Sequence, residues 1–437
     1  MTSLDSQTMR TLQEGLTSAQ DVFAARFPGE STARQPVSVI YGGAHLFKAE
    51  TAQKLGALAR QALANYAPDA ASLADALDLD ELLAAQVYPR LVAKLEREPI
   101  EDLRIDFEDG YGHRSDEEED GHALEAARQV ARAFQENLLP PFFGIRIKPM
   151  SAELGARAIR TLDLFLTELK RPVLVTLPKV VSVAQVQLFV GMLGELERKL
   201  GFPAKSLRCE FMVESAQGLI DAEGRALLPQ LHAAAEGRLQ AAHFGTYDYT
   251  ASLDITAALQ GMQHPACDFA KAQMKHAFAG TGVFLSDGAT TQLPIVPNKW
   301  PSLTEAQREE NRRVVHEAWL ASSDDIRHSL MGGFYQGWDL HPAQLVARYG
   351  TVFSFFLESL ESATERLSNF VKKLGQATVS GDVFDDAATG QGLLNFFLRG
   401  LACGALTDEE GAATGLTPAE LQSRSFLVIA RNRRAIS

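Results

Sequence analysis

Charged residues stand at the ends of several apolar segments in this sequence of 437 residues. Four β-branched or aromatic runs end in charge, in the segments LRIDFEDGYG, FGIRIKP, LVTLPKV and CEFMVESAQG, and a fifth run, AAHFGTYDY, ends near Asp248. A strand that is buried on both faces is expected to be apolar throughout, because burying a charge without a partner is costly. The charged groups are therefore candidates for chemistry. They are Asp106, Glu108, Asp109, Arg146, Lys148, Lys179, Glu214 and Asp248.

The types of these residues indicate what they bind. Glu214 and Asp248 follow consecutive predicted strands, with no His or Cys next to either of them. Such an all-oxygen donor set suits Mg²⁺, which takes one or two carboxylates and completes its shell with water and substrate oxygens; Mn²⁺ is the second candidate. The planar guanidinium of Arg146 binds a carboxylate or phosphate at two points. The set predicts a pocket for a small anionic oxo acid chelated to metal, with a purely structural ring of ion pairs as the alternative.

The elements that position these groups are short strands alternating with long helices. Strands are predicted over residues 37–41, 103–107, 142–147, 173–177, 209–213 and 241–245, and two further strands over 282–285 and 330–335. Helices are predicted over 50–66, 79–98, 116–137, 152–170, 183–200 and 304–320. Eight strands alternating with helices favour parallel βαβ units.

The spacing of the charged strand ends supports a closed barrel. Arg146 and Lys179 are 33 positions apart, Lys179 and Glu214 are 35 apart, and Glu214 and Asp248 are 34 apart. A barrel of about 250 residues has about 31 residues in each of its eight units. We therefore predict an α/β fold, a (β/α)8 TIM barrel, and not an open sheet, since no G-x-G-x-x-G or Walker A loop follows a strand. The carboxyl ends of barrel strands share one face, where the charged groups would meet.

The ends of the chain depart from this repeat. Residues 1–36 are interpreted as an N-terminal helix and a polar linker, residues 37–350 as the catalytic barrel, and residues 351–437 as a helical C-terminal extension. Amphipathic patterns over 351–374 and 390–406 and the helix start Thr417-Pro-Ala-Glu420 predict the extension. We expect it either to cover the barrel mouth or to dock on a neighbouring subunit, and we expect a homo-oligomer.

Composition excludes several classes of partner. The net charge is −13, from 55 acidic and 42 basic residues, which argues against a nucleic-acid partner. No apolar run approaches the roughly 20 residues of a membrane helix. Three cysteines are too few for a disulfide framework, and the start MTSLDSQTMRTLQEGL lacks the regions of a secretory signal. We therefore expect a cytoplasmic protein.

A series of short motifs lies between residues 100 and 345. They are Asp106-Phe-Glu-Asp109, Arg146, Pro178-Lys179-Val180, Glu214, Phe244-Gly-Thr-Tyr-Asp248 and His341-Pro-Ala-Gln344. The ordered set resembles the HpcH/HpaI aldolase and citrate lyase β-subunit family. The resemblance implies a metal-dependent barrel that makes or breaks carbon–carbon bonds beside a carbonyl group.

The resemblance also implies roles for individual residues. Glu214 and Asp248 would hold Mg²⁺. Arg146 would bind a substrate carboxylate and the oxygen of a developing enolate. Glu108 and Asp109 would orient metal-bound water or Arg146. Lys179 is a further expected catalytic residue, and Asp106 and Lys148 are expected to bind substrate.

Two features depart from the family pattern. Val181 stands where an acidic residue is expected after the fourth strand. The loop GYGHRSDEEE, residues 110–119, is acidic and suits a solvated helix N-terminus better than a phosphate site of coenzyme A. Both departures bear on an acyl-CoA substrate more than on the metal site.

The predicted function is a Mg²⁺-dependent carbon–carbon lyase or aldolase acting on a small hydroxy or oxo acid, free or as a thioester. A malate-synthase-like condensation of an acyl-CoA with glyoxylate uses the same enolate chemistry and is the second hypothesis. A catalytically silent barrel that binds an acidic metabolite is the third. His113 is a candidate general base, although a solvated loop histidine is the simpler interpretation, and the base is left unassigned.

Overall fold

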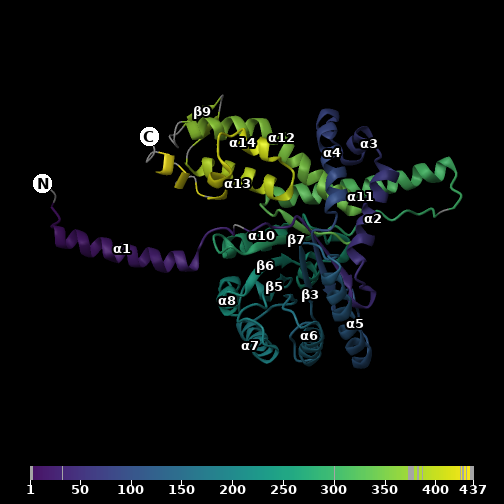
Figure 1. Ribbon diagram of the computed structural model, residues 1–437, viewed down its shortest axis with the longest axis horizontal. Helices are drawn as coiled ribbons and strands as arrows, with labels where there is room; N and C mark the ends of the chain where they lie inside the picture. Colours follow the sequence, from purple (N-terminus) through teal and green to yellow (C-terminus); the bar gives the residue numbers. More distant parts are fainter. Residues whose placement is uncertain are drawn as a thin grey trace.

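A closed barrel forms the centre of the molecule (Figure 1). The computed structural model describes residues 3–31, 33–299, 301–372, 378–380, 383–385, 387–423, 425, 428–429 and 431–433. Eight parallel strands follow one another around the barrel in chain order, and the last pairs with the first. They are β1 (Ser38–Gly43), β2 (Asp102–Asp106), β3 (Phe142–Arg146), β4 (Leu174–Leu177), β5 (Cys209–Val213), β6 (Leu239–Phe244), β7 (Phe284–Ala289) and β8 (Gln336–Trp338). The predicted (β/α)8 TIM barrel is confirmed.

Helices cover the outside of the barrel. They are α2 (Thr51–Tyr66), α3 (Ala70–Leu77), α4 (Glu81–Arg97), α5 (Asp116–Gln135), α6 (Gly155–Leu169), α7 (Val183–Leu200), α8 (Leu228–Ala234), α9 (Thr246–Ser252), α10 (Pro265–Phe278) and α11 (Glu305–Met331). Three of them, α2 to α4, fill the long connection between β1 and β2. Among the described residues, none of the helices combines the length and hydrophobicity that crossing a bilayer requires.

The eighth strand does not lie where the sequence pattern predicts it. The apolar run from Leu330 belongs instead to the end of α11, and β8 begins only at Gln336. The helix continues past the predicted end at residue 320 because Ile326 and Leu330, four positions apart, are buried on one helical face. A short apolar run at a helix end was therefore taken for a strand.

The barrel interior contains paired charges below its mouth. Arg104 of β2 donates to Glu210 of β5 from Nε at 3.0 Å and from Nη2 at 2.7 Å. These strands are not neighbours, so the pair crosses the interior. Asp102 is a second partner of Arg104. We expected β2 and β5 to be apolar up to their ends, and this expectation is wrong. Alternate residues of each strand face the barrel interior, and there a charged residue can pair with an opposite charge across the barrel.

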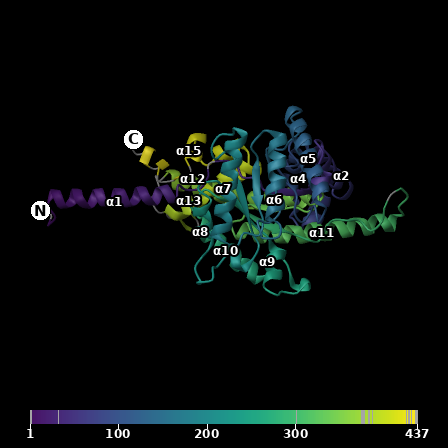
Figure 2. The ribbon, with the colours of Figure 1, turned by 90° about the horizontal axis from the view of Figure 1, so that it is seen from below.

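The N-terminal helix α1 (Ser6–Arg26) projects away from the barrel (Figures 1 and 2). All of its residues are exposed. The following linker returns to the barrel, where the N–H of Gly29 donates to the carbonyl of Gly280 at 2.8 Å.

The C-terminal helices are α12 (Gln344–Lys372), α13 (Ala387–Cys403), α14 (Asp408–Ala412) and α15 (Pro418–Gln422) (Figure 1). Helix α12 packs on α4 and α11, α13 packs on α12, and α14 and α15 pack on α13. Two short antiparallel strands, β9 (Thr378–Ser380) and β10 (Val383–Asp385), precede α13. Arg399 of α13 donates to Gln35 at 2.6 Å and lies 5.0 Å from the ring of Tyr335. These two residues precede β1 and β8, so the extension lies at the amino-terminal end of the barrel. The expectation that it covers the mouth is wrong, and the domain division at residue 350, which falls within α12, stays a prediction.

Candidate active site

Asp106 fixes the guanidinium of Arg146 at the carboxyl end of the barrel. The two residues face each other in the register of β2 and β3. Nε and Nη2 of Arg146 donate to Oδ1 and Oδ2 of Asp106 at 2.7 and 2.6 Å. Asp106 also accepts the backbone N–H groups of Glu108 and Gly110, at 2.9 and 2.7 Å. With these four bonds and an exposure of 1%, Asp106 is suited to position Arg146 more than to contact a substrate.

Two aromatic rings make cation–π contacts with the guanidinium of Arg146. The guanidinium carbon lies 4.9 Å from the ring centroid of Tyr41 and 5.4 Å from that of Trp338. Nη1 lies 2.9 Å from Oε2 of Glu108 but has no hydrogen bond of good geometry. The sequence reasoning missed both rings, because nothing in the chain links a residue of β1 or β8 to the arginine of β3. Arg146 thus keeps one donor for a ligand.

Lys179 joins the carboxylates of the mouth. Its Nζ lies 2.9 Å from Oε1 of Glu108 and 3.0 Å from Oδ2 of Asp248, and its backbone N–H donates to Oε1 of Glu214 at 2.6 Å. The backbone of Lys179 is left-handed, with a φ of 51°, a conformation that residues with a side chain adopt only occasionally. Burial lowers the pKa of Lys179, but the Glu214 and Glu108 carboxylates raise it by more, so the ammonium is retained.

Glu214 is the most perturbed acid of this group. It is 3% exposed just after β5. Burial, together with Glu108 and Asp248, raises its pKa to about 8, although Lys179 acts in the opposite direction. Burial also raises the pKa of Glu108. Gly245 lies against Glu214 so closely that an added Cβ would be 2.5 Å from the Glu214 Cβ. Only glycine leaves room for this carboxylate, which gives the glycine of the F-G motif a physical role.

The donor set fits a hard divalent cation. The mouth contains five carboxyl groups, Asp106, Glu108, Asp109, Glu214 and Asp248, against the two cations Arg146 and Lys179. In the part of the chain that the structure describes, no three His, Cys, Asp or Glu side chains converge as a ligand cluster. Mg²⁺ needs only one or two carboxylates, since water and substrate oxygens fill its other positions. Glu214, short of positive charge, and Asp248, half exposed, meet this requirement.

Lys148 does not join the cluster around Arg146. Its Nζ pairs with Glu119 of α5 at 2.8 Å, donates to the carbonyl of Phe107 at 2.7 Å and lies over the ring of Tyr111. The ammonium predicted to bind substrate is therefore already neutralised, although the side chain lines the cavity beside the site.

Three further residues lie outside the cluster around Arg146. His113 is exposed at the rim of the same cavity. Asp287 is buried against Lys271 and accepts from Ser329 at 2.6 Å. The Nδ1 of His341 accepts the N–H of Ala343, as expected for a residue that begins a helix.

Fold and site together define a class: a TIM-barrel protein whose mouth combines a buried arginine with surplus carboxylates. The chain belongs to the family described as "Domain of unknown function (DUF6986)", which matches residues 16–429. No curated protein matches the chain.

Solved structures share the architecture. A citrate lyase from Burkholderia xenovorans LB400 is 20% identical with a TM-score of 0.57, over 88% of this chain and 97% of that chain. The protein CitE from Mycobacterium tuberculosis, in complex with magnesium, acetoacetate and coenzyme A, is 15% identical with a TM-score of 0.48, over 85% and 99%. Haloferax volcanii malate synthase, in a ternary complex with pyruvate and acetyl-CoA, is 14% identical with a TM-score of 0.45, over 91% and 98%. The first likeness establishes the barrel fold, and membership of the HpcH/HpaI family stays a prediction.

Proposed function

We propose that this protein is a Mg²⁺-dependent carbon–carbon lyase or aldolase acting on a small hydroxy or oxo acid. The proposal rests on two observations at the mouth of the barrel: an arginine nitrogen without a hydrogen bond, and carboxylates that outnumber the cations. Nη1 of Arg146 has no hydrogen bond, and Glu214 and Asp248 share the single ammonium of Lys179 with Glu108. An anionic substrate would accept a hydrogen bond from Arg146, and a divalent cation would neutralise the two carboxylates.

Each residue has a distinct part in this reaction. Glu214 and Asp248 would hold the cation, which would supply positive charge beside the substrate carbonyl. Nη1 of Arg146 donates to the carbonyl oxygen that becomes negative as the carbon–carbon bond breaks. Asp106, Tyr41 and Trp338 fix the arginine for this task.

Proton transfer is assigned to Glu108. It lines the cavity, contacts both Arg146 and Lys179, and has a pKa raised by burial. In the cleavage direction the substrate hydroxyl loses its proton, and the bonding electrons pass to the carbon beside the carbonyl, forming an enolate. A proton then returns to that carbon, which yields an oxo acid and an aldehyde or ketone.

Deuterium exchange tests this proposal without knowledge of the full substrate. Pyruvate, and separately acetyl-CoA, are incubated with the protein and Mg²⁺ in D₂O and followed by NMR. Metal-dependent exchange at the pyruvate methyl group, lost with EDTA and in Glu214→Ala, is expected. Exchange of acetyl-CoA alone would favour the condensation of an acyl-CoA, and exchange of neither compound would favour a barrel that only binds a metabolite.

A further inference from the structure

A cavity of about 700 Å³ opens beside the charged site. Glu108 and Lys179 form its inner end, and the loops after β2, β3 and β4 form its walls. Its volume is within the range of small-molecule pockets. The apolar part of the wall consists of Pro149, Met150, Leu154 and Val181.

The cavity offers no free cation among the lysines and arginines that the structure describes in its lining. Lys148 is paired with Glu119 and Lys179 with Glu108 and Asp248. The rim carries two exposed acids, Asp109 and Glu153. A chain of phosphates or a second carboxylate on the substrate would therefore meet repulsion here.

Val181 is the wall residue with the clearest departure from expectation. It replaces an acidic residue expected after the fourth strand, and its side chain is 43% exposed although apolar. Gln185 holds this wall in place. Its Oε1 accepts the N–H of Val181 at 2.9 Å, and its Nε2 lies 3.3 Å from the carbonyl oxygens of Met150 and Lys179. An ordered apolar surface next to charged groups suits a substrate that has one anionic end and one apolar end.

We infer that the cavity binds an uncharged, apolar chain attached to the oxo-acid group, so that the substrate is a hydroxy-oxo acid with an alkyl or aryl tail. The inference rests on the proposed function and names its substrate class. The acid group binds at Arg146 and at the cation that Glu214 and Asp248 would hold, and the tail lies along Met150, Leu154 and Val181. Cleavage then yields an oxo acid and an apolar aldehyde, the tail leaving with the aldehyde.

Two matched substrates test the inference. Both are γ-hydroxy-α-oxo acids; one carries a phenyl group at the γ carbon, and the other carries a short chain that ends in a carboxylate. Release of pyruvate gives kcat/KM for each. We expect a preference for the phenyl substrate of about 10-fold or more. Val181→Asp should lower kcat/KM for the phenyl substrate about 10-fold, whereas Val181→Thr, similar in shape and neutral, should retain most of it.

The exchange of free pyruvate separates this inference from the proposed function. Pyruvate has no tail, so its deuterium exchange by the wild-type protein reports the enolate chemistry alone. If pyruvate exchanges but the carboxylate substrate is cleaved as fast as the phenyl substrate or faster, the inference of an apolar tail is wrong, whereas the proposed lyase activity is retained. Absence of both exchange and cleavage would overturn the lyase, and the inference with it.

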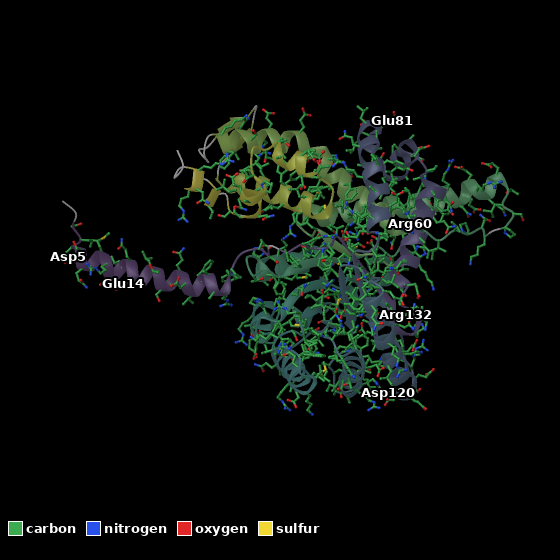
Figure 3. All side chains as sticks on the ribbon, viewed as in Figure 1. Asp5, Glu14, Arg60, Glu81, Asp120 and Arg132 are labelled. Atoms are coloured by element: carbon green, nitrogen blue, oxygen red, sulfur yellow. The ribbon has the colours of Figure 1, made fainter. Side chains whose placement is uncertain are left out.

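A second inference comes from α1 and is independent of the site. Figure 3 shows Asp5 and Glu14 on this helix, far from the barrel. Apolar residues recur along it at spacings of three and four, which is the pattern of a coiled-coil seam. They are Met9, Leu12, Leu16, Ala19 and Phe23, with Leu16 70% and Phe23 61% exposed.

Nothing in the same chain covers this stripe among the described residues. The bond from Gly29 to Gly280 holds the base of the helix while the helix points away from its own barrel. The helix has no buried residue, so it lacks the tertiary packing that gives most protein helices their stability, and Gly15 lowers its helix propensity further. The helix therefore requires a partner.

We propose that this partner is α1 of a second copy, packed antiparallel. The positions that flank the stripe, Gln13, Gly15, Gln20 and Val22, carry no charge that would repel a copy or select another sequence. An antiparallel pair brings Asp5 at one helix end near Arg26 at the end of the other, whereas a parallel pair brings like charges together.

Light scattering on the full-length protein tests this arrangement. A dimer is expected for the wild type and a monomer for Leu16→Asp, whereas Ser18→Asp on the opposite helix face should remain dimeric. Deuterium exchange by the barrel should persist in all three. A monomeric wild type, or a Leu16→Asp variant that stays dimeric, would overturn the proposal.

Discussion

At the amino-terminal end of the barrel the buried carboxylate of Glu101 is paired with two cations, whereas at the carboxyl end carboxylates outnumber cations and face a cavity. Glu101 represents the first end. One of its oxygens accepts from Lys94 and Arg34, both at 2.6 Å, and the other accepts the N–H of Val37 at 2.5 Å. Glu214 represents the second end, where it accepts the backbone N–H of Lys179 at 2.6 Å and its pKa rises to about 8.

The difference separates structural from functional charge. A buried carboxylate with full partners keeps its charge and stabilises the native arrangement of its neighbours. A buried carboxylate without enough partners destabilises the native state, and such groups cluster where a ligand supplies the missing charge. Both ends have similar residue types, so only their balance of partners distinguishes them.

The largest expected effect on stability is at the balanced end. Glu101→Gln leaves Lys94, which is 3% exposed, with Glu98 as its remaining carboxylate partner, and we expect a loss of about 3 kcal/mol in the free energy of unfolding. Urea denaturation measures this loss. The control is Glu410→Gln, which breaks a half-buried pair with Arg90 and should cost about 1 kcal/mol or less. Equal stabilities of the two variants would contradict the comparison.

The reverse result is expected at the mouth. Glu214→Gln removes a carboxyl group that the fold does not neutralise, so the unfolding free energy should stay the same or rise. Enolate chemistry should fall by about 10²–10³-fold, the equivalent of about 2.7–4 kcal/mol in the transition state. Deuterium exchange and urea denaturation on the same preparation measure both quantities. A stability loss like that of Glu101→Gln would show that Glu214 is structural.

The pH dependence of stability provides a finer test. In the native state Glu214 keeps its proton up to about pH 8, whereas in the unfolded chain it is released near 4.5. Between these values the native state binds more protons, so the free energy of unfolding falls as pH rises, by at most about 1.4 kcal/mol for each pH unit. Denaturation at pH 6 and 7 without metal should show this fall, and Glu214→Gln should reduce it. Added Mg²⁺ should stabilise the wild type more at pH 8 than at pH 6; equal stabilisation at both would contradict metal binding by this carboxylate.

Much of the fold was predictable because strands and helices leave local patterns. The strand Cys209–Val213 and the helix Val183–Leu200 have the predicted ends, since apolar periodicity is strong there. The prediction of the eighth strand was wrong because a strand of three residues, Gln336–Trp338, is too short to show an apolar period. The place of the C-terminal helices depends on contacts such as Arg399 with Gln35, 364 positions apart, which no local pattern contains.

The site was predictable to the same degree. Residues at strand ends could be brought together by topology alone, and Arg146, Asp106, Glu108, Lys179, Glu214 and Asp248 do form one group. The direction of a side chain could not be inferred in this way. Lys148, two positions after Arg146, pairs with Glu119 because that residue is buried within reach on α5. Tyr41 and Trp338 were missed for the same reason.

The smallest expected effect concerns these two rings, and it tests how the mouth holds its arginine. Trp338→Leu removes one face of the stack on Arg146 but leaves the two hydrogen bonds to Asp106 intact. A stack of this kind contributes about 1–2 kcal/mol when partly desolvated, so deuterium exchange should fall about 5–30-fold. Trp338→Phe keeps an aromatic face and should retain activity within a few-fold. If Phe and Leu are equally impaired, the ring only fills space and Asp106 alone positions the arginine; if Leu alone is impaired, the aromatic faces hold the guanidinium at an angle that leaves Nη1 directed to the substrate.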